Sequence, residues 1–518
     1  MHSRILLGAG LLGLVGCGVF GSDGSAPTPP AGEAPPVVTQ DDGGGLPEGA
    51  PPPSVGTPAN NELTNEFGVF VTATAPAGGD GTMDHPFATI SAGIERVKDL
   101  KLRVYVCAGT YKESLMLVNA VSVISALSCD GGVWKTGGAH AVLEAPTSPA
   151  VRAKGIALAT RLEGFDVTAP AGTAMAPNSI ALIAENATML AVANSTLTSA
   201  AAFDGADGTD GVQLTAGPNV NGHNGATSGG PSPLAPPVFA TPFQPGAAGG
   251  VGSCVGAAGH DGVSGGKGGN GATQQCTGNI TGACTWQVPD AVYNRTDAVA
   301  QPAGPGAAGT DGASASTLGL FSATVGYAPA NGAAGADGSP GKGGTGGNGG
   351  PEWSTAGKTA LEGNLYRVSA SGPGGGAGGC PGLAGTSGTG GGASLAALVF
   401  GSPGLTLSTV DLVAGDGGRG GKGTFGSLPQ PGGQHGTTPT GATPATGGSF
   451  GGRAGFSGNG AGGPSAALAF TGGAVIVSPD THTTAGTAGA GVAARTEPFT
   501  SVTMPTSAAG SSKAVLQF

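Results

Sequence analysis

Residues 102–123 read LRVYVCAGTYKESLMLVNAVSV, and this stretch decides the fold. Leu, Val and Val alternate with other residues at 102–106, and shorter apolar pieces follow at 115–117 and 121–123. Alternation with a period of two is typical of β-strands. Strands this short and this closely spaced do not suit the hairpins of a sandwich. They favour a coil that turns three times per rung and stacks rung upon rung.

The residues just before this stretch have the spacing of a helix. Apolar residues three or four positions apart, with charged residues between them, are Ile90, Ile94, Val97 and Leu100. This pattern predicts a short amphipathic helix.

A set of motif residues surrounds the helix and the strands. They are Gly81-Thr82, Pro86-Phe87-x-Thr89-Ile90, Val104-Tyr105-Val106 and Gly109-Thr110-Tyr111-x-Glu113. In these residues the chain resembles the right-handed parallel β-helix proteins of the pectin-lyase-like superfamily. The resemblance covers about 65–200 well and the remainder loosely. It implies an all-β protein, a right-handed parallel β-helix whose short N-terminal helix caps the open end of the coil.

A unit of two short apolar stretches followed by a glycine-rich segment occurs three times, beginning at Ser179, Ser394 and Ser465. The repetition predicts rungs that share one core and glycine-rich excursions that leave from one edge. The expected domains are a β-helix core at 61–203, Gly-rich excursions with embedded rungs at 204–393, and C-terminal rungs with Gly-rich loops at 394–518.

Glycine supplies 106 of the 518 residues, and it recurs at every third position in 335–350 and 259–271. A collagen triple helix would need abundant proline and longer runs. Disordered linkers are the compositional default but need no period. The third alternative is a bundle of extended helices with three residues per turn, in which Gly lets backbones approach and bond laterally. The strict period favours this bundle of polyglycine- or polyproline-II-like excursions, similar to glycine-rich surface proteins of the PE-PGRS type.

The N-terminus has the pattern of an export signal. His2 and Arg4 precede an apolar run at 5–15, which is shorter than the roughly 20 residues of a spanning helix. The run ends in Leu14-Val15-Gly16-Cys17, which resembles the bacterial lipobox. The resemblance implies a lipoprotein signal peptide at 1–16 and acylation of Cys17, palmitate included. We therefore expect an exported protein, lipid-anchored at the outer membrane or cell surface, with a Pro/Gly-rich linker at 17–60.

Six cysteines follow Cys17, an even number that suggests three disulfides in an exported chain. The 22 residues from Cys107 to Cys129 match about one rung of the β-helix that the resemblance implies, so we expect these two to pair. Cys276 and Cys284 flank a stretch typical of a hairpin, which a second disulfide would close. Cys254 and Cys380 are then left as the third pair, although the sequence keeps the pairing of these four open.

The chain carries 20 basic and 31 acidic residues, a net charge of −11 that argues against a nucleic-acid partner. Parallel β-helix proteins of the resembling superfamily often cleave acidic polysaccharides, with Asp side chains holding Ca²⁺ and an Arg or Lys abstracting a proton. The residues that such a site could use are Arg152, Lys154, Arg161, Glu163 and Asp166. Nothing in the sequence brings them together on one sheet face, so we expect solvent-facing charges and no enzyme.

Asp precedes Gly repeatedly in the Gly-rich segments. The positions are Asp204, Asp207, Asp210, Asp261, Asp311, Asp337 and Asp416. Asp oxygens beside tight turns ligate Ca²⁺ in some proteins, but the known calcium-binding repeat also needs an apolar residue that these segments lack. Asp-Gly is equally common in turns for backbone reasons. We expect no metal and no cofactor.

These observations predict a non-catalytic cell-surface lipoprotein with a structural, adhesive or ligand-presenting role. Its expected partners are the lipid bilayer, through the acylated N-terminus, and a surface polysaccharide or another cell-surface protein. The alternative is a polysaccharide-binding or polysaccharide-cleaving β-helix protein.

Overall fold

The computed structural model describes residues 56–100, 102–227, 229–232, 243–277, 285–287, 299, 304–350, 366–368 and 370–518. All of them belong to one compact unit, Leu46–Phe518. The expected signal peptide, Cys17 and most of the expected linker at 17–60 lie outside the described residues. Thr57 already belongs to the fold, because its Oγ1 donates to the Glu163 carboxylate at 2.6 Å.

The parallel strands form three stacks, which we call columns, and successive turns of the chain add a strand, or half of a strand, to each column. The first column contains β1 (Gly68–Val71), β2 (Arg103–Cys107), β5 (Val123–Ser128), β9 (Thr160–Glu163), the first halves of β12 (Leu190–Ser199) and β23 (Thr406–Ala414), and β25 (Ile476–Val477). The second contains β3 (Thr110–Tyr111), β7 (Ala141–Glu144), β10 (Phe165–Ala169), the second halves of β12 and β23, and β26 (His482–Thr484). The third contains β4 (Leu115–Leu117), β8 (Val151–Lys154), β11 (Ser179–Glu185), β22 (Ser394–Phe400), β24 (Ser465–Thr471) and β29 (Ser512–Gln517).

From β2 onward the chain visits the first, second and third columns in the same order on every turn, and neighbouring strands within a column pair in parallel. A short strand, β6 (Lys135–Thr136), adds an antiparallel pair beside β5. The parallel sheets curl into a half-barrel, an arrangement compatible with the parallel β-helix expected from the sequence.

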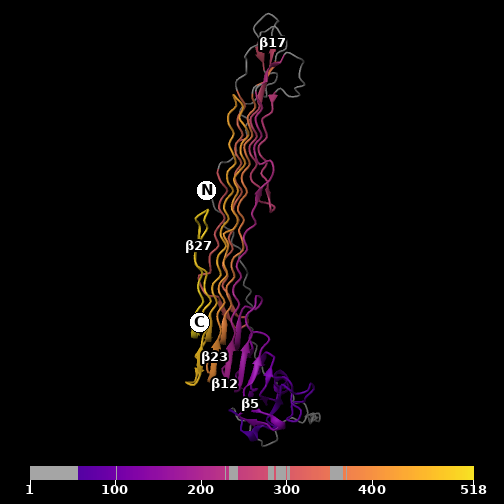
Figure 1. Cartoon of the computed structure of the whole chain (residues 1–518), viewed down its shortest axis with the longest axis vertical. Coiled ribbons are helices and arrows are strands. Elements are labelled where there is room, and N and C mark those ends of the chain that lie inside the picture. Colours follow the sequence, from indigo (N-terminus) through magenta and orange to yellow (C-terminus); the bar gives the residue numbers. More distant parts are fainter. Residues whose placement is uncertain are drawn as a thin grey trace, which may run out of the picture. The chain divides into compact units, whose positions relative to one another are not determined.

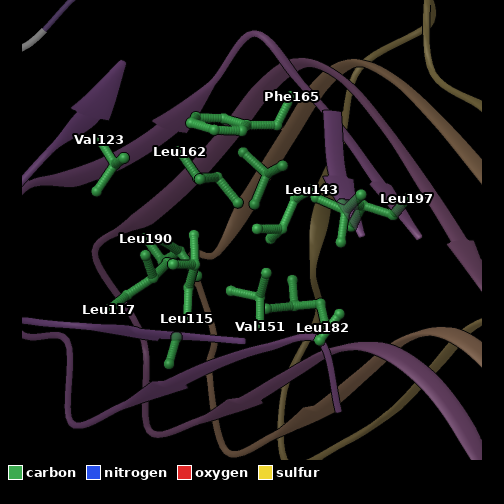
Figure 2. Packing of buried hydrophobic residues seen from close by; sticks show 14 of the residues in the cluster. Leu115, Leu117, Val123, Leu143, Val151, Leu162, Phe165, Leu182, Leu190 and Leu197 are labelled. Atoms are coloured by element: carbon green, nitrogen blue, oxygen red, sulfur yellow. The ribbon is translucent and has the colours of Figure 1, made fainter. Parts of the chain in front are cut away.

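Within each column, the strand register aligns apolar side chains from one turn to the next. Val104 pairs with Val123, and Val123 pairs with Leu162 on the next turn. All three are fully buried. Figure 2 shows Leu162 gathered with Leu143 of the second column and with Leu182 of the third. Each turn therefore buries one small set of branched side chains against the set of the turn before it, at about 25 cal/mol per Å² of apolar surface.

On three consecutive turns the bend between the first and second columns uses a single residue. Gly164, Asn194 and Thr409 occupy this position, with φ values of 79°, 41° and 53°. A Cβ on Gly164 would lie 2.7 Å from the backbone N of Ala126, so only glycine fits there.

A helix covers the first turn. α1 (Ile90–Val97) is capped at its N-terminus by Thr89, whose side chain accepts from the N–H of Ala92 at 3.3 Å. The helix buries Ile90, Ile94 and Val97 in the core shared by the columns. The Glu113 carboxylate accepts the N–H of Ile90 at 2.8 Å, a favourable charge at a helix N-terminus. The helix predicted from the apolar spacing is therefore present. Two short 3₁₀ turns are η1 (Asn60–Glu62) and η2 (Asp130–Gly132).

Three glycine-rich connections, 200–393, 415–464 and 485–511, leave the same corner of consecutive turns. Each departs after a strand of the second column (β12, β23 and β26) and returns to a strand of the third (β22, β24 and β29). The departure from one edge agrees with the prediction from the repeats. The described part of 200–393 contributes no strand to the columns, so the rungs expected within it are not found there.

The glycine-rich segments form a laterally hydrogen-bonded bundle, which we call the glycine bundle. The N–H groups of Gly306, Gly309 and Gly312 donate to carbonyls at 450, 453 and 456 at 2.9, 2.8 and 2.7 Å. A step of three on both segments matches an extended helix with three residues per turn. These two segments run parallel, whereas Gly338 and Gly341 donate to carbonyls at 382 and 379, an antiparallel pair. The mixture of directions excludes a collagen triple helix, whose chains are all parallel. In Figure 1 these segments lie side by side.

The segment 370–393 lies at the centre of the bundle. It donates N–H groups to the segments near 266, 223 and 449, and it accepts N–H groups from those near 250, 341 and 433. Residues 370–383 are buried throughout. A Cβ on Gly374, Gly375 or Gly376 would lie 1.9, 2.1 and 1.9 Å from carbonyl oxygens of three different segments. Where a segment has neighbours on all sides, each residue faces another backbone, and glycine is therefore nearly continuous. Where a segment lies at the edge of the bundle, only every third residue is glycine.

The connections also carry short antiparallel pairs. These are β13 (Thr215–Ala216) with β16 (Cys254–Val255), β19 (Leu320–Ser322) with β20 (Gly326–Ala328), and β27 (Arg495–Thr496) with β28 (Thr503–Met504). A larger antiparallel sheet comprises β14 (Gly229–Ser232), β15 (Phe243–Gln244), β17 (Gly271–Thr277), β18 (Thr285–Gln287) and β21 (Tyr366–Val368).

Candidate functional site

The charged residues considered for catalysis do not meet in one place. Arg152 of β8 donates to the carbonyls of Ala323 and Thr324 at 2.7 and 3.2 Å, and so holds the turn of the β19–β20 hairpin. Lys154 pairs with Glu185 of the same column at 3.2 Å. Arg152 therefore attaches the β19–β20 hairpin to the third column, and Lys154 links two strands within that column.

The other three candidates lie on the first two columns. The Arg161 Nε donates to the Glu163 carboxylate at 2.5 Å, and that carboxylate is only 7% exposed. Asp166 of β10 contacts the His140 Nδ1 at 2.9 Å. Each candidate thus has a local partner of its own, and the convergent carboxylates and base of a polysaccharide-cleaving site are not formed by these residues. Among the described residues, no group of three or more His, Cys, Asp or Glu side chains is placed to hold a metal ion.

Two of the expected disulfides are present. Cys107 and Cys129, with Cα atoms 5.8 Å apart, join neighbouring turns of the first column. They pack with the rings of Phe70, Tyr105 and Trp134 in a second apolar cluster.

The second disulfide joins Cys254 to Cys380, also with Cα atoms 5.8 Å apart, and so ties a turn of the bundle to its central segment. The hairpin expected around 276–284 agrees with the antiparallel pairing of β17 and β18, in which Cys276 lies opposite Trp286. Cys284 lies outside the described residues, so its disulfide with Cys276 stays a prediction.

The Asp-Gly steps have a structural role that neither calcium binding nor a tight turn explains. Asp204 Oδ1 accepts the N–H of Arg419 at 2.8 Å, and the N–H of Gly205 donates to the carbonyl of the same Arg419 at 2.7 Å. Asp207 and Gly208 bind Lys422 in the same way, through distances of 2.8 and 2.7 Å. One Asp-Gly step therefore satisfies both backbone groups of one residue in the neighbouring segment.

This two-bond step recurs across the bundle. Asp311-Gly312 binds Phe456, and Asp416-Gly417 binds Thr487. The N–H of Thr487 lowers the pKa of Asp416, because it hydrogen-bonds the charged form of the carboxylate. Asn-Gly steps act alike at Asn221 and Asn224. No local sequence pattern indicates this role, because each partner lies more than 70 residues away along the chain.

The large antiparallel sheet, which we call the reversal sheet, is the candidate binding surface. Its strands come from three separate chain reversals of the bundle, near 227–245, 271–304 and 350–370. β21 pairs with both β14 and β17, and β17 pairs with β15 and β18, so the three reversals form one sheet. The segment 370–393 connects this sheet to β22. Fully extended at about 3.1 Å per residue, the segment has a contour length on the order of 70 Å.

The residue content of the reversal sheet differs from that of the bundle. Its strands contain Trp286 and Tyr366, whereas the rest of the three connections, over the residues that the structure describes, contains Tyr327 as its only Trp or Tyr. Trp and Tyr are enriched at protein interfaces and in their energetic centres. The strands of the sheet therefore carry residue types that are typical of contact surfaces.

No protein-family model, curated protein or solved structure that was compared with the chain matches it. The resemblance to β-helix proteins and to lipoproteins therefore rests on the motifs quoted above. Within the described part of the chain, no helix combines the length and the apolar character that crossing a membrane would require.

Proposed function

We propose that the protein is a non-catalytic surface lipoprotein that presents a binding surface on a rigid support. The observation that carries this proposal is the pairing of strands from three separate chain reversals into the reversal sheet. A sheet built in this way holds residues from distant parts of the sequence in one place. Such an arrangement suits contact with a ligand, namely a surface polysaccharide or another cell-surface protein.

The glycine bundle supports this role because it fixes the reversals at their bases. In the central segment, Gly374, Gly375 and Gly376 each donate an N–H to a different neighbouring segment, at 2.9, 2.9 and 3.1 Å. A binding surface held by such a network loses little conformational entropy when it meets a ligand. The columns, which we propose to wind as a right-handed parallel β-helix, anchor both ends of each connection.

The proposed location follows from the lipobox at Cys17, whose acylation would attach the chain to an outer membrane or the cell surface. The two disulfides of the described residues support an oxidising compartment. The proline-rich linker after Cys17 would then separate the body from the bilayer.

The test is binding by full-length protein displayed on cells, measured with a panel of polysaccharides and with cells bearing surface proteins. We expect a ligand from this panel to bind, and the double variant Trp286→Ala/Tyr366→Ala to weaken that binding at least tenfold. The matched control is Phe450→Ala, which removes an aromatic ring that is 58% exposed but belongs to the bundle. Equal weakening by the control would refute the assignment of binding to the reversal sheet.

The non-catalytic part of the proposal has a separate readout. The same polysaccharides are assayed for new reducing or unsaturated ends after incubation with the protein. Turnover that is abolished by Asp166→Asn or Arg161→Gln would show that the charged residues of the first two columns act in catalysis, and the proposal would then be wrong.

A further inference from the structure

A hollow of about 260 Å³ lies between the glycine bundle and the β27–β28 hairpin, and we call it the hairpin hollow. Its apolar wall includes Phe425, Leu428 and Phe499. Phe499, near the tip of the hairpin, is 80% exposed, and Leu428 is 37% exposed. Apolar groups left in water around a hollow are typical of a binding site.

The hydrogen-bonding pattern of the bundle is interrupted at this hollow. Asp204, Asp207 and Gln213 each accept, through a side-chain oxygen, the N–H of the residue 215 positions further on. Asp210 lies in the same three-residue series, and Phe425 stands 215 positions after it. Among the described residues, the Asp210 carboxylate makes no such bond and lines the hollow instead. A carboxylate that could join a regular series is therefore exposed to a ligand.

A second carboxylate faces the hollow from the hairpin. Glu497 accepts from the N–H of Thr500 and from its Oγ1, the latter at 2.7 Å, and both bonds use Oε2. The backbone N–H of Phe499 also hydrogen-bonds this carboxylate. The hairpin thus holds a second negative charge at the hollow.

The nearby cations offset these two charges only in part. Arg453 lines the hollow, but its guanidinium forms a two-bond pair with Asp311, at 2.8 and 3.1 Å. Arg495 lies on the same hairpin, with its guanidinium carbon 5.4 Å from the centre of the Phe425 ring. Its Nη2 donates to the carbonyl of Gly423 and to the Asn459 side chain, which are both neutral, so its positive charge offsets one of the two carboxylates. The surroundings of the hollow therefore keep a net negative charge.

We propose that the hairpin hollow binds a small organic cation, an ammonium group on an aliphatic body. The ammonium would donate to the carboxylates of Asp210 and Glu497, while the aliphatic body would cover the rings of Phe425 and Phe499. The carboxylates attract the charge, and the aromatic rings remove apolar surface of the aliphatic body from water. A free amine and a lysine side chain share this chemistry. This site is independent of the reversal sheet, so loss of binding here leaves the proposed function intact.

The test uses the full chain and hexylammonium as the probe, with affinity measured by calorimetry or by ligand-observed NMR. We expect Asp210→Asn and Glu497→Gln each to weaken binding about five- to tenfold, and Phe499→Ala to weaken it to a similar degree. The matched controls are Asp480→Asn and Phe450→Ala, which change exposed residues outside the hollow and should leave the affinity unchanged. Nα-acetyl-lysine amide, which keeps its side-chain ammonium, is tested in parallel and tells whether a lysine side chain is accepted as well as a free amine.

Two results would overturn the proposal. One is equal affinity for 1-hexanol, which would mean that the hollow selects apolar shape and not charge. The other is unchanged hexylammonium binding by Asp210→Asn and Glu497→Gln. Both substitutions preserve side-chain shape, so they keep the test sound even if Phe499→Ala disturbs the hairpin.

Discussion

Alanine at Gly376 should destabilise the protein strongly. The new Cβ would lie 1.9 Å from the carbonyl oxygen of Gly433, whereas ordinary contacts begin at 3.4 Å. The two segments must therefore separate by about 1.5 Å. The adjacent bonds from Gly376 N to Thr446 O and from Gly433 N to Ala377 O, at 3.1 and 2.7 Å, would weaken or break.

The expected loss follows from these bonds. Each lost hydrogen bond contributes about 1 kcal/mol, and leaving its buried groups without partners adds about 1–3 kcal/mol. The smaller entropy of the unfolded alanine chain returns about 0.4–1 kcal/mol. The net change in the free energy of unfolding is thus a loss of about 2–4 kcal/mol. If the glycine-rich segments were flexible linkers, the same substitution would be neutral or slightly stabilising.

The assay is denaturant unfolding of the full chain, with amide hydrogen exchange to locate the change. Gly447→Ala is the matched control, because its Cβ would lie 3.3 Å from the same Gly433 oxygen. We expect the control to cost less than 1 kcal/mol, and we expect faster exchange in Gly376→Ala at the amides bonded to segment 370–393. Equal stability of the two variants would refute the packing argument.

Three further predictions concern charge, disulfides and anchoring. Backbone N–H donors from Lys422 and Thr487 lower the pKa of Asp207 and Asp416 below the ordinary value of 3.8. A carboxylate with a lowered pKa stabilises the fold above the ordinary value, and this contribution is lost as the pH falls through the lowered pKa. The urea midpoint of unfolding should therefore drop below about pH 4, and the variant with Asn at both positions should show a smaller drop. Replacing Cys129 by Ser should lower the free energy of unfolding by about 2–4 kcal/mol, and Cys107→Ser, which removes the same disulfide and leaves Cys254–Cys380 intact, should lose a similar amount. Cys17→Ser should move the protein from the detergent phase to the aqueous phase in phase partitioning, and an unchanged distribution would contradict the lipid anchor.

The sequence predicted those features whose signal lies within a few residues. The apolar alternation at 102–123, the helical spacing at 90–100 and the three-residue glycine period are all local, and each agrees with the structure. The pairing of Cys107 with Cys129 agrees as well, since it needs only the length of one turn.

Features that depend on distant partners were not predictable in this way. The role of Asp204 depends on Arg419, which the chain reaches only after the whole first connection. Arg152 and Arg161 are close in sequence, yet they lie on different columns, because the coil sends successive strands to different columns. Proximity along a chain that coils in this manner therefore says little about convergence at a site.

The central segment of the glycine bundle has a consequence for heat capacity. Most of its buried surface is peptide backbone, with few apolar side chains. Exposure of polar surface lowers the heat capacity, whereas exposure of apolar surface raises it. The bundle should therefore contribute little to the heat-capacity increment of unfolding, and its stability should change less steeply on cooling than that of the strand columns.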